Sequence, residues 1–387
     1  MLAPIDTWQR VLRDAELLEA VRDVDATDVA AVVRLRKRWP VDVVRVALDL
    51  AAARRKARDK FGGLAERLIG DPAGVEQATS LAVARYKAKR IVDTLGADAD
   101  VLDLCCGIGG DAMGLTGCGA GVVAVDRDPT RAWMASCNAG CEAVAADVAT
   151  IDVAGRAIYI DPQRRSAAGR AWRLDDYEPG PDVLSRIVSS ASSAAVKLGP
   201  GVDVEAVTSL APASHEVEFI SEAGRLVQAV LWAGQPATHA RRATLIQADG
   251  DVATLASDRS PVPQVAPAGR YLFTVDAAVE RAGLPGLLGE RHACGMIHPA
   301  LGLFTADVLI DSPWLTPFEL IEQMPWRRRT VKAWLRAHDA GIVEVKTRGR
   351  VVDTDKVQRD LRGDGHVTFT VFVLRVYQQF VAMIARR

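Results

Sequence analysis

The sequence predicts an α/β fold in which a parallel sheet follows a block of helices and precedes a second, smaller α/β unit. Three observations carry this prediction. The apolar run Val101–Leu104 leads through a glycine turn, Gly107–Gly110, into residues that favour a helix, which is how open α/β sheets form nucleotide-sized pockets. Further apolar runs each end in an acid, and the residues before Ala97 carry helical periodicity.

Residues 1–96 are predicted to form an N-terminal helical domain, because apolar residues recur every three or four positions from Trp8 onward. The basic run from Arg54 to Lys60 is interpreted as a solvated helix face. Capping and turn residues mark where the helices should begin and end. We expect N-caps at Asp6–Thr7 and Asp28, and breaks at Gly62–Gly63 and Asp71–Pro72.

Residues 97–250 are predicted to form the central α/β domain. After the glycine turn, three further apolar runs have the pattern of strands, and an acid follows each of them. With Asp103 on the first strand, four acids are therefore expected at the rim where open α/β sheets bind ligands. The three runs are Gly121–Val125 before Asp126, Cys141–Ala146 before Asp147, and Arg156–Ile160 before Asp161.

The second half of this domain is predicted from apolar runs between turn residues. We expect a helix over Leu184–Leu198, with Lys197 in its last turn and Gly199–Gly201 as the stop. A fifth strand is expected over Val202–Thr208. The remaining strands are expected at Val217–Ile220, Leu226–Trp232 and Ala243–Ile246.

A proline-rich passage, residues 251–269, is predicted to be a linker. Residues 270–387 then have the pattern of a mixed α/β domain. Its predicted helices are Val279–Leu288, which Pro285 interrupts, and Val331–His338. Its predicted strands are Ile342–Lys346, Val351–Val352 and His366–Arg375.

Two classes of ligand fit the glycine turn. Gly107, Gly109 and Ala112 match a degenerate dinucleotide fingerprint, with Asp126 at the distance of a ribose-binding acid. Alternatively, Asp103 faces the ammonium and sulfonium end of S-adenosylmethionine, which is positive where a dinucleotide carries pyrophosphate. The Asp-Pro pair at 161–162 suits a methyltransferase and has no use in a dehydrogenase.

These motifs resemble motifs one to four of class I S-adenosylmethionine-dependent methyltransferases: Asp103–Asp111, Asp126–Pro129, Asp147 and Asp161–Pro162. Within that superfamily the chain is similar to the trimethylguanosine synthase group and closer to bacterial methyltransferases with a THUMP-like C-terminal domain. Glu76–Arg90 resembles the helix that precedes the core in those families. The resemblance implies a Rossmann-like methyltransferase sheet and S-adenosylmethionine as cofactor. The cofactor-binding residues that it implies are Asp103, Cys105, Gly107, Ile108, Gly109, Gly110, Asp111, Asp126, Arg127, Asp147 and Val148.

The resemblance also locates methyl transfer at Asp161 and Pro162. Methyltransferases of base amines usually continue with a second proline and an aromatic that stacks on the base, where this chain has Gln163 and Arg164. We therefore expect Trp172 or Tyr177 to supply the stacking platform. Arg164, counted with the catalytic residues, and Arg165 are expected to pair with a substrate phosphate or carboxylate.

The C-terminal segment predicts RNA as the substrate. Ile321–Arg387 holds fourteen Lys and Arg against seven Asp and Glu, a net charge of +7, whereas the whole chain has a net charge of −1. This asymmetry indicates a polyanionic partner, and Glu344–Gly349 resembles a stretch of THUMP-like domains. The expected RNA contacts are Arg327, Arg328, Lys346, Arg348 and Arg350.

Composition bears on the location of the protein in the cell and on metal binding. No apolar run is long enough to cross a membrane, and the N-terminus lacks a secretory pattern, so we expect a cytoplasmic protein. The six cysteines have no repeated metal-binding spacing, so no metal is expected. Two alternatives to an active RNA methyltransferase stay open, a catalytically inactive module that binds cofactor or RNA and an NAD(P)-dependent oxidoreductase. The oligomeric state is not predicted.

Overall fold

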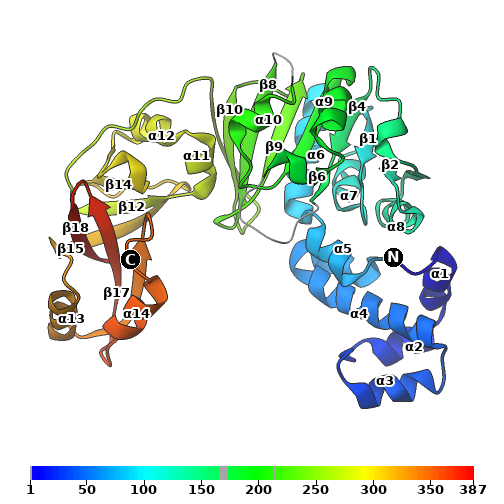
Figure 1. Ribbon diagram of the computed structural model, residues 1–387, viewed down its shortest axis with the longest axis horizontal. Coiled ribbons are helices and arrows are strands. Elements are labelled where there is room, and N and C mark those ends of the chain that lie inside the picture. The colour runs from blue at the N-terminus through cyan, green and yellow to red at the C-terminus, as the bar shows by residue number, and fades with distance from the viewer. Residues whose placement is uncertain (1, 165–172, 212–213) are drawn as a thin grey trace. The chain divides into compact units, whose positions relative to one another are not determined.

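The computed structural model describes residues 2–164, 173–211 and 214–387, and the chain divides into two compact units (Figure 1). The first unit holds the residues up to Ile220 together with Val227–Ala240. The second holds Ser221–Leu226 and Arg241–Arg387. Among the described residues, no helix combines the length and the apolar character that a bilayer span requires.

The first unit begins with helices, as predicted. Their apolar sides share one core, which includes Trp8 and Leu50 and reaches Ile108 and Met134 of the following α/β region. Asp28 caps a helix by accepting a hydrogen bond from the backbone N–H of Ala31, but the predicted cap at Asp6–Thr7 is wrong, because the first helix already follows Pro4. The helices are α1 Ile5–Arg13, α2 Ala15–Val21, α3 Val29–Arg36, α4 Val41–Phe61, the 3-10 helix Gly62–Arg67, α5 Pro72–Gln77 and α6 Leu81–Leu95.

The basic run on α4 is not a purely solvated face. Arg55 donates to the carbonyl of Arg22 at 2.6 Å. Lys60 Nζ donates to the carbonyls of Val75, Glu76 and Ala78 at 2.9, 2.6 and 2.7 Å. Lys60 thereby satisfies carbonyls at the C-terminal end of α5 that have no partner within the helix. This fixes the segment that leads from α5 into α6.

The sheet of the first unit has the strand order β8-β9-β7-β4-β1-β2-β3. The strands β7, β4, β1, β2 and β3 run parallel, and β9 is antiparallel to β7. The carboxyl ends of the parallel strands therefore meet at one edge of the sheet, as the acid-tipped runs predicted. The strands are β1 Asp100–Leu104, β2 Gly121–Asp126, β3 Glu142–Ala145, β4 Ala157–Ile160, β7 Ser193–Leu198, β8 His215–Glu222 and β9 Arg225–Gly234.

Glycine is required where α7 begins and where it packs against its neighbours. Gly109 has φ of 83°, and a Cβ there would lie 2.8 Å from the Cα of Ala135. At Gly114 a Cβ would lie 2.6 Å from the carbonyl carbon of Ala84. The remaining elements are α7 Gly110–Gly117, α8 Pro129–Ala139, the 3-10 helix Val148–Thr150, the strand pair β5 Gln163–Arg164 and β6 Tyr177–Glu178, the 3-10 helix Leu174–Asp176, α9 Pro181–Ser190 and α10 Val204–Thr208.

Two predictions for this half of the sheet are wrong. The expected helix Leu184–Leu198 ends at Ser190, and Ser193–Leu198 is the parallel strand β7. A short apolar run with both faces buried does not reveal its type by periodicity, so Lys197 ends a strand and not a helix. The expected strand Val202–Thr208 is instead the helix α10, which Asp203 caps by accepting from the N–H of Glu205.

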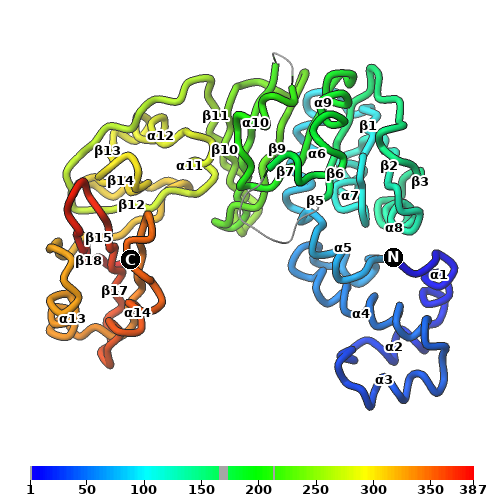
Figure 2. Tube along the Cα trace, in the orientation of Figure 1, coloured from blue at the N-terminus to red at the C-terminus, as the bar shows by residue number. Residues whose placement is uncertain are grey.

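The second unit contains a seven-stranded sheet of order β13-β14-β12-β15-β18-β17-β16. Figure 2 traces the path of the chain through this unit. Part of the expected linker is strand, because β11 lies within it and pairs with β10. Val351 and Val352 are not a strand and precede α14, and the helix expected around Pro285 is divided in two. The elements are β10 Arg241–Ile246, β11 Val252–Ser257, β12 Tyr271–Val275, α11 Ala277–Ala282, α12 Pro285–His292, β13 Gly295–Met296, the 3-10 helix Pro299–Leu301, β14 Leu303–Ala306, β15 Leu315–Pro325, α13 Arg328–Ala337, β16 Ala340–Thr347, α14 Thr354–Leu361, β17 Val367–Val376 and β18 Gln379–Arg386.

Candidate active site

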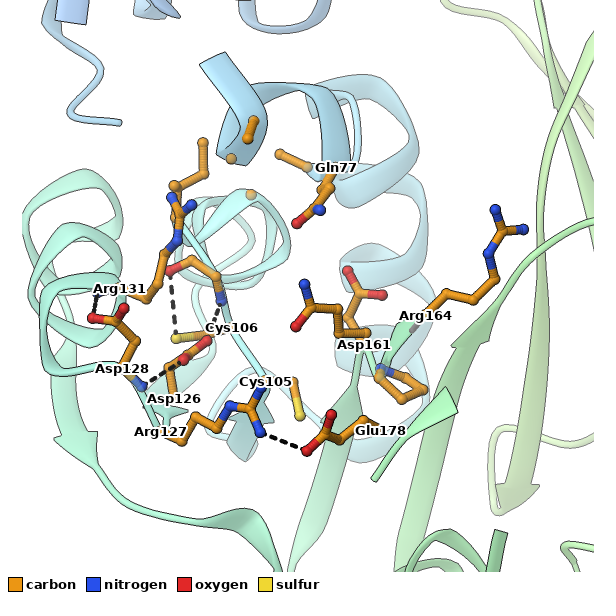
Figure 3. A pocket seen from close by; sticks show the side chains of 18 of the residues that line it. Gln77, Cys105, Cys106, Asp126, Arg127, Asp128, Arg131, Asp161, Arg164 and Glu178 are labelled. Carbon is orange, nitrogen blue, oxygen red and sulfur yellow. Dashed lines mark hydrogen bonds and ion pairs between the residues drawn. The ribbon is translucent and has the colours of Figure 1, made fainter. Parts of the chain in front are cut away.

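A cavity of about 1650 Å³ lies at the carboxyl edge of the first unit's sheet (Figure 3). Residues from α5, the glycine turn, and the ends of β2, β4 and β7 line it. Pockets for single small molecules are usually about 300–1,000 Å³. The cavity therefore has room for a nucleoside-sized cofactor together with part of a second molecule.

The glycine turn and Asp126 form one end of this cavity. Gly107 has φ of 57°, a conformation that favours glycine. Its N–H donates to Asp126 Oδ2 at 3.0 Å, and the N–H of Asp128 donates to Oδ1 at 2.9 Å. Burial raises the pKa of Asp126, although these two hydrogen bonds oppose the shift. Asp126 therefore joins the turn after β1 to the end of β2.

Most of the predicted cofactor residues lie on the cavity wall. Arg127, next to Asp126, pairs with Glu178 at 2.5 Å across the cavity (Figure 3). Two of the predicted residues, Asp103 and Gly109, are not among the described residues that line the cavity. Those that line it are Cys105, Gly107, Ile108, Gly110, Asp111, Asp126, Arg127, Asp147 and Val148.

Asp103 is buried on β1, with 1 % of its surface exposed. Among the described residues, neither of its carboxylate oxygens has a hydrogen-bond partner. Burial, followed by the nearby charges of Asp111 and Asp161, raises its pKa well above the ordinary value. The site therefore favours the neutral form of Asp103 until a cationic group approaches it.

Asp111 is held by two residues that precede the sheet. Lys87 Nζ lies 2.7 Å from Asp111 Oδ1, and Thr79 Oγ1 donates to Oδ2 at 2.7 Å. Lys87 also donates a hydrogen bond to the hydroxyl of Tyr159. Burial raises the pKa of Asp111, but the charges of Lys87 and Lys197 and the hydrogen bonds outweigh it, so this pKa lies below its ordinary value. Asp111 therefore anchors α7 to α6.

Lys87 lies on the helix that was expected to lead into the site, either on a solvated face or in contact with substrate or cofactor, but its buried ion pair with Asp111 was not predicted, although a signal for it exists. It is 1 % exposed and lies on the buried side of α6, together with Val83, Ala84 and Ile91. A lysine within an apolar helical stripe is uncommon, because a buried ammonium requires a partner. Burial lowers the pKa of Lys87, and Asp111 opposes that shift.

Asp161 and Lys197 form a second ion pair at the other end of the cavity. Lys197 Nζ lies 2.6 Å from Asp161 Oδ2 and also donates to the carbonyl of Gln77 at 3.4 Å. Burial raises the pKa of Asp161 despite the charge of Lys197. The pKa of Lys197 is itself raised, because Asp161 and Asp111 outweigh the effect of burial. Asp161 Oδ1 has no hydrogen bond to the described residues, so it can accept one from a ligand.

The other residues expected near the transfer point are distributed differently. Pro162 and Arg164 line the cavity, but the side chain of Arg164 points away from Asp161 (Figure 3). Tyr177 is buried, and its hydroxyl accepts from the N–H of Gly199 at 2.8 Å. Arg165 and Trp172 lie outside the residues that the structure describes.

The basic residues predicted to contact RNA lie in the second unit, in two groups. Arg327 and Arg328 stand at the start of α13, and Lys346, Arg348 and Arg350 stand at the end of β16 and in the turn after it. Three of them are in ion pairs: Arg328 with Asp360 at 2.6 Å, Lys346 with Glu344 at 2.7 Å, and Arg348 with Glu280 at 2.8 Å.

Comparisons with known proteins agree with these observations. Residues 315–387 match a family model described as THUMP domain-like. An uncharacterized S-adenosylmethionine-dependent methyltransferase of Mycobacterium tuberculosis (strain CDC 1551 / Oshkosh) is 33 % identical over 342 residues, which cover 85 % of this chain and 92 % of the relative. Its counterpart in strain ATCC 25618 / H37Rv gives the same values. A solved structure from Porphyromonas gingivalis W83, whose name places it among the methyltransferases, shares the fold over 100 % of both chains, with a TM-score of 0.74 and 16 % identity.

Proposed function

We propose that this chain, which belongs to the family of S-adenosylmethionine-dependent methyltransferases that includes these mycobacterial relatives, methylates RNA. In this proposal the acceptor is an exocyclic amine of a base, and Asp161 lies at the point of transfer. The protein is a class I methyltransferase with a Rossmann-like fold and a THUMP-like C-terminal domain. Its cofactor is S-adenosylmethionine. The oxidoreductase alternative is thereby set aside.

The acidic side chains of the cavity wall support the assignment of the residues proposed to hold the cofactor. S-adenosylmethionine supplies a methyl group on a positively charged sulfur, and it also carries an ammonium group. Asp111 lies on the cavity wall near the turn, and Asp103 is buried on the strand beneath it without a partner among the described residues, where an approaching cation would favour its ionised form. Asp126 would accept the ribose hydroxyls, and Asp147 the adenine amine. Such an acidic wall would repel the pyrophosphate of a dinucleotide.

The proposed chemistry depends on the carboxylate of Asp161. Its Oδ2 is held by Lys197, and its Oδ1 remains available to a substrate within the cavity. An amine that donates one hydrogen to Oδ1 keeps its nitrogen lone pair directed elsewhere, toward the methyl carbon. The nitrogen–carbon bond would form as the carbon–sulfur bond breaks and S-adenosylhomocysteine leaves with the sulfur, and the nitrogen would then lose one proton to Asp161 or water. Alignment is the main requirement, because the methyl group is already activated.

The assay that tests this proposal supplies radiolabelled S-adenosylmethionine together with RNA, DNA or protein. We expect label in RNA, and nucleoside analysis should find it on a base nitrogen. Label confined to DNA or protein would contradict an RNA substrate. No transfer to any acceptor, with cofactor binding intact, would favour a catalytically inactive binding module.

The start of α13 supports contact with RNA. Arg327, Arg328 and Arg329 are consecutive and exposed, and the first turn of α13 contains no acid. Among the described residues, Arg327 and Arg329 have no ion pair, whereas Arg328 pairs with Asp360. Positive charge at a helix N-terminus is unfavourable in the free protein, and a phosphate group would relieve it.

We predict that the double variant Arg327→Glu, Arg329→Glu weakens RNA binding about tenfold or more at low salt, because each phosphate contact contributes to affinity through counterion release. The slope of log Kd against log salt should fall by about one for each lost contact. Arg34→Glu, Arg36→Glu on α3 is the matched control, since it changes the net charge equally on exposed residues of the other unit. Equal binding by both double variants would contradict the role of α13.

A further inference from the structure

Gln228 on β9 is a buried polar residue that methyl transfer at Asp161 leaves unexplained. Its side chain lines the cavity and is only 4 % exposed. Among the described residues, its amide nitrogen Nε2 has no hydrogen-bond partner. Burying an amide without a partner is unfavourable, and most buried polar groups in native proteins are satisfied. A ligand in the cavity would supply the missing partner.

The strand register brings Gln228 to the point of transfer. Val230 on β9 lies opposite Lys197 on β7, and residues two apart on a strand share a face. Gln228 is therefore on the same face as Lys197. Lys197 in turn pairs with Asp161, which follows the last residue of β4. Gln228, Lys197 and Asp161 thus succeed one another along one face of the sheet, and all three line the cavity.

We propose that Gln228 selects the substrate by donating a hydrogen bond to a ring nitrogen adjacent to the amine that Asp161 holds. This inference rests on the proposed methylation of a base amine. Asp161 Oδ1 is an acceptor, and the Gln228 amide is a donor on the same face, with Lys197 of β7 on the strand between them. Together they match a base edge on which an amine stands next to an unprotonated ring nitrogen.

This pairing defines a class of substrate. Adenine, cytosine and guanine each carry an exocyclic amine next to a ring nitrogen that accepts hydrogen bonds. Uracil and hypoxanthine lack the amine, and a lysine side chain lacks the adjacent acceptor. A site built to hydrogen-bond such an edge rejects analogues without it, because its own buried polar groups are then left unpaired. Gln228 is accordingly a specificity-determining residue, and Asp161 stays the residue at the reacting nitrogen.

The substitution that tests this role is Gln228→Leu, which keeps a similar volume and removes the amide. Loss of one hydrogen bond to a buried group should lower kcat/KM for the accepted RNA by about 10- to 100-fold. Binding of S-adenosylhomocysteine should not change, and the thermal unfolding midpoint should not fall, because the variant removes a buried amide that has no partner among the described residues. Gln228→Asn retains an amide on a shorter stem and serves as the second variant if the leucine variant does not fold.

The experiment has two arms. In the first, uridine-rich RNA oligonucleotides that contain adenosine, cytidine, guanosine or inosine are assayed for methyl transfer by the wild type and both variants. In the second, cytidine, guanosine, adenosine, uridine and inosine are titrated calorimetrically into the protein saturated with S-adenosylhomocysteine, which occupies the cofactor's own adenosine site. We expect the wild type to bind at least one amino nucleoside and neither uridine nor inosine, and Gln228→Leu to lose that selectivity.

The two arms separate the two claims. If the wild type methylates none of the RNAs, the proposed RNA methylation fails, and the nucleoside titration still decides the role of Gln228. Unchanged nucleoside binding by Gln228→Leu would overturn that role. Binding of uridine as strong as that of the amino nucleosides, or no binding of any amino nucleoside by the wild type, would overturn it as well.

Discussion

The Asp161→Asn variant is expected to lower the rate constant of methyl transfer by about 100- to 10,000-fold, the range that a positioned proton acceptor usually contributes. An amide at this position presents a weaker acceptor or a donor to the substrate amine. It also weakens the attraction that holds Lys197 Nζ at 2.6 Å from the present carboxylate. The measurement is single-turnover transfer of labelled methyl to RNA, with enzyme in excess.

Controls must show that the variant is folded and still binds the cofactor. Asp161 lies across the cavity from Asp126, which we propose holds the ribose (Figure 3). The affinity for S-adenosylhomocysteine should therefore be close to that of the wild type. A variant that keeps its wild-type rate would contradict the role of Asp161. Loss of both rate and cofactor affinity would indicate that the substitution disturbs the whole cavity.

The Lys87→Met variant is expected to reduce the free energy of unfolding by about 3–5 kcal/mol, because it leaves a buried carboxylate without its cation. Lys87 Nζ lies 2.7 Å from Asp111 Oδ1, and the two side chains are 1 % and 8 % exposed. Methionine has nearly the same length and can fill the same space without the charge. Urea denaturation followed by circular dichroism measures the change.

The matched control for Lys87→Met is the double variant Lys87→Met, Asp111→Asn. Removing both charges should recover much of the lost stability, because neither partner then remains ionised without the other. A single variant that is as stable as the wild type would contradict the importance of this ion pair. A double variant less stable than the single variant would show that Asp111 acts through another partner.

The same ion pair gives stability a dependence on pH. The pKa of Asp111 lies below its ordinary value of 3.8 in the folded state. The unfolded state therefore binds the proton more readily between these two pKa values. The contribution of Asp111 to the free energy of unfolding is complete above pH 3.8 and is lost as the pH falls through the folded-state pKa.

The sequence predicted those parts of the site that depend on local chemistry. Gly107 and Gly109 occupy left-handed conformations that a strand–turn–helix connection requires, so their spacing predicted the turn. Asp126 ends a parallel strand, Asp147 and Asp161 come after two others, and their position on one cavity wall follows from the topology. The predicted role of each residue in cofactor binding stays a prediction.

Other parts of the site depend on contacts between distant segments. Lys197 was assigned to a helix because Ser193–Leu198 is apolar on both faces, and only the sheet shows that it ends beside Asp161. Gln228 has no local signal, since its position depends on β9 pairing antiparallel with β7. Asp103, expected to face the cofactor directly, is buried beneath the turn. These positions could be predicted only from the order of the strands in the sheet, which the spacing of residues along the sequence does not provide.

The central claim is that this cavity binds S-adenosylmethionine with Asp126 at the ribose. Calorimetric titration with S-adenosylhomocysteine tests it most directly, on the wild type, on Asp126→Ala, and on Asp98→Ala, which removes an exposed carboxylate outside the cavity wall. We predict binding by the wild type and by Asp98→Ala, and weakening by at least about tenfold in a folded Asp126→Ala variant, because the two ribose hydroxyls lose their acceptor. No binding by the wild type, or equal binding by Asp126→Ala, would contradict the account.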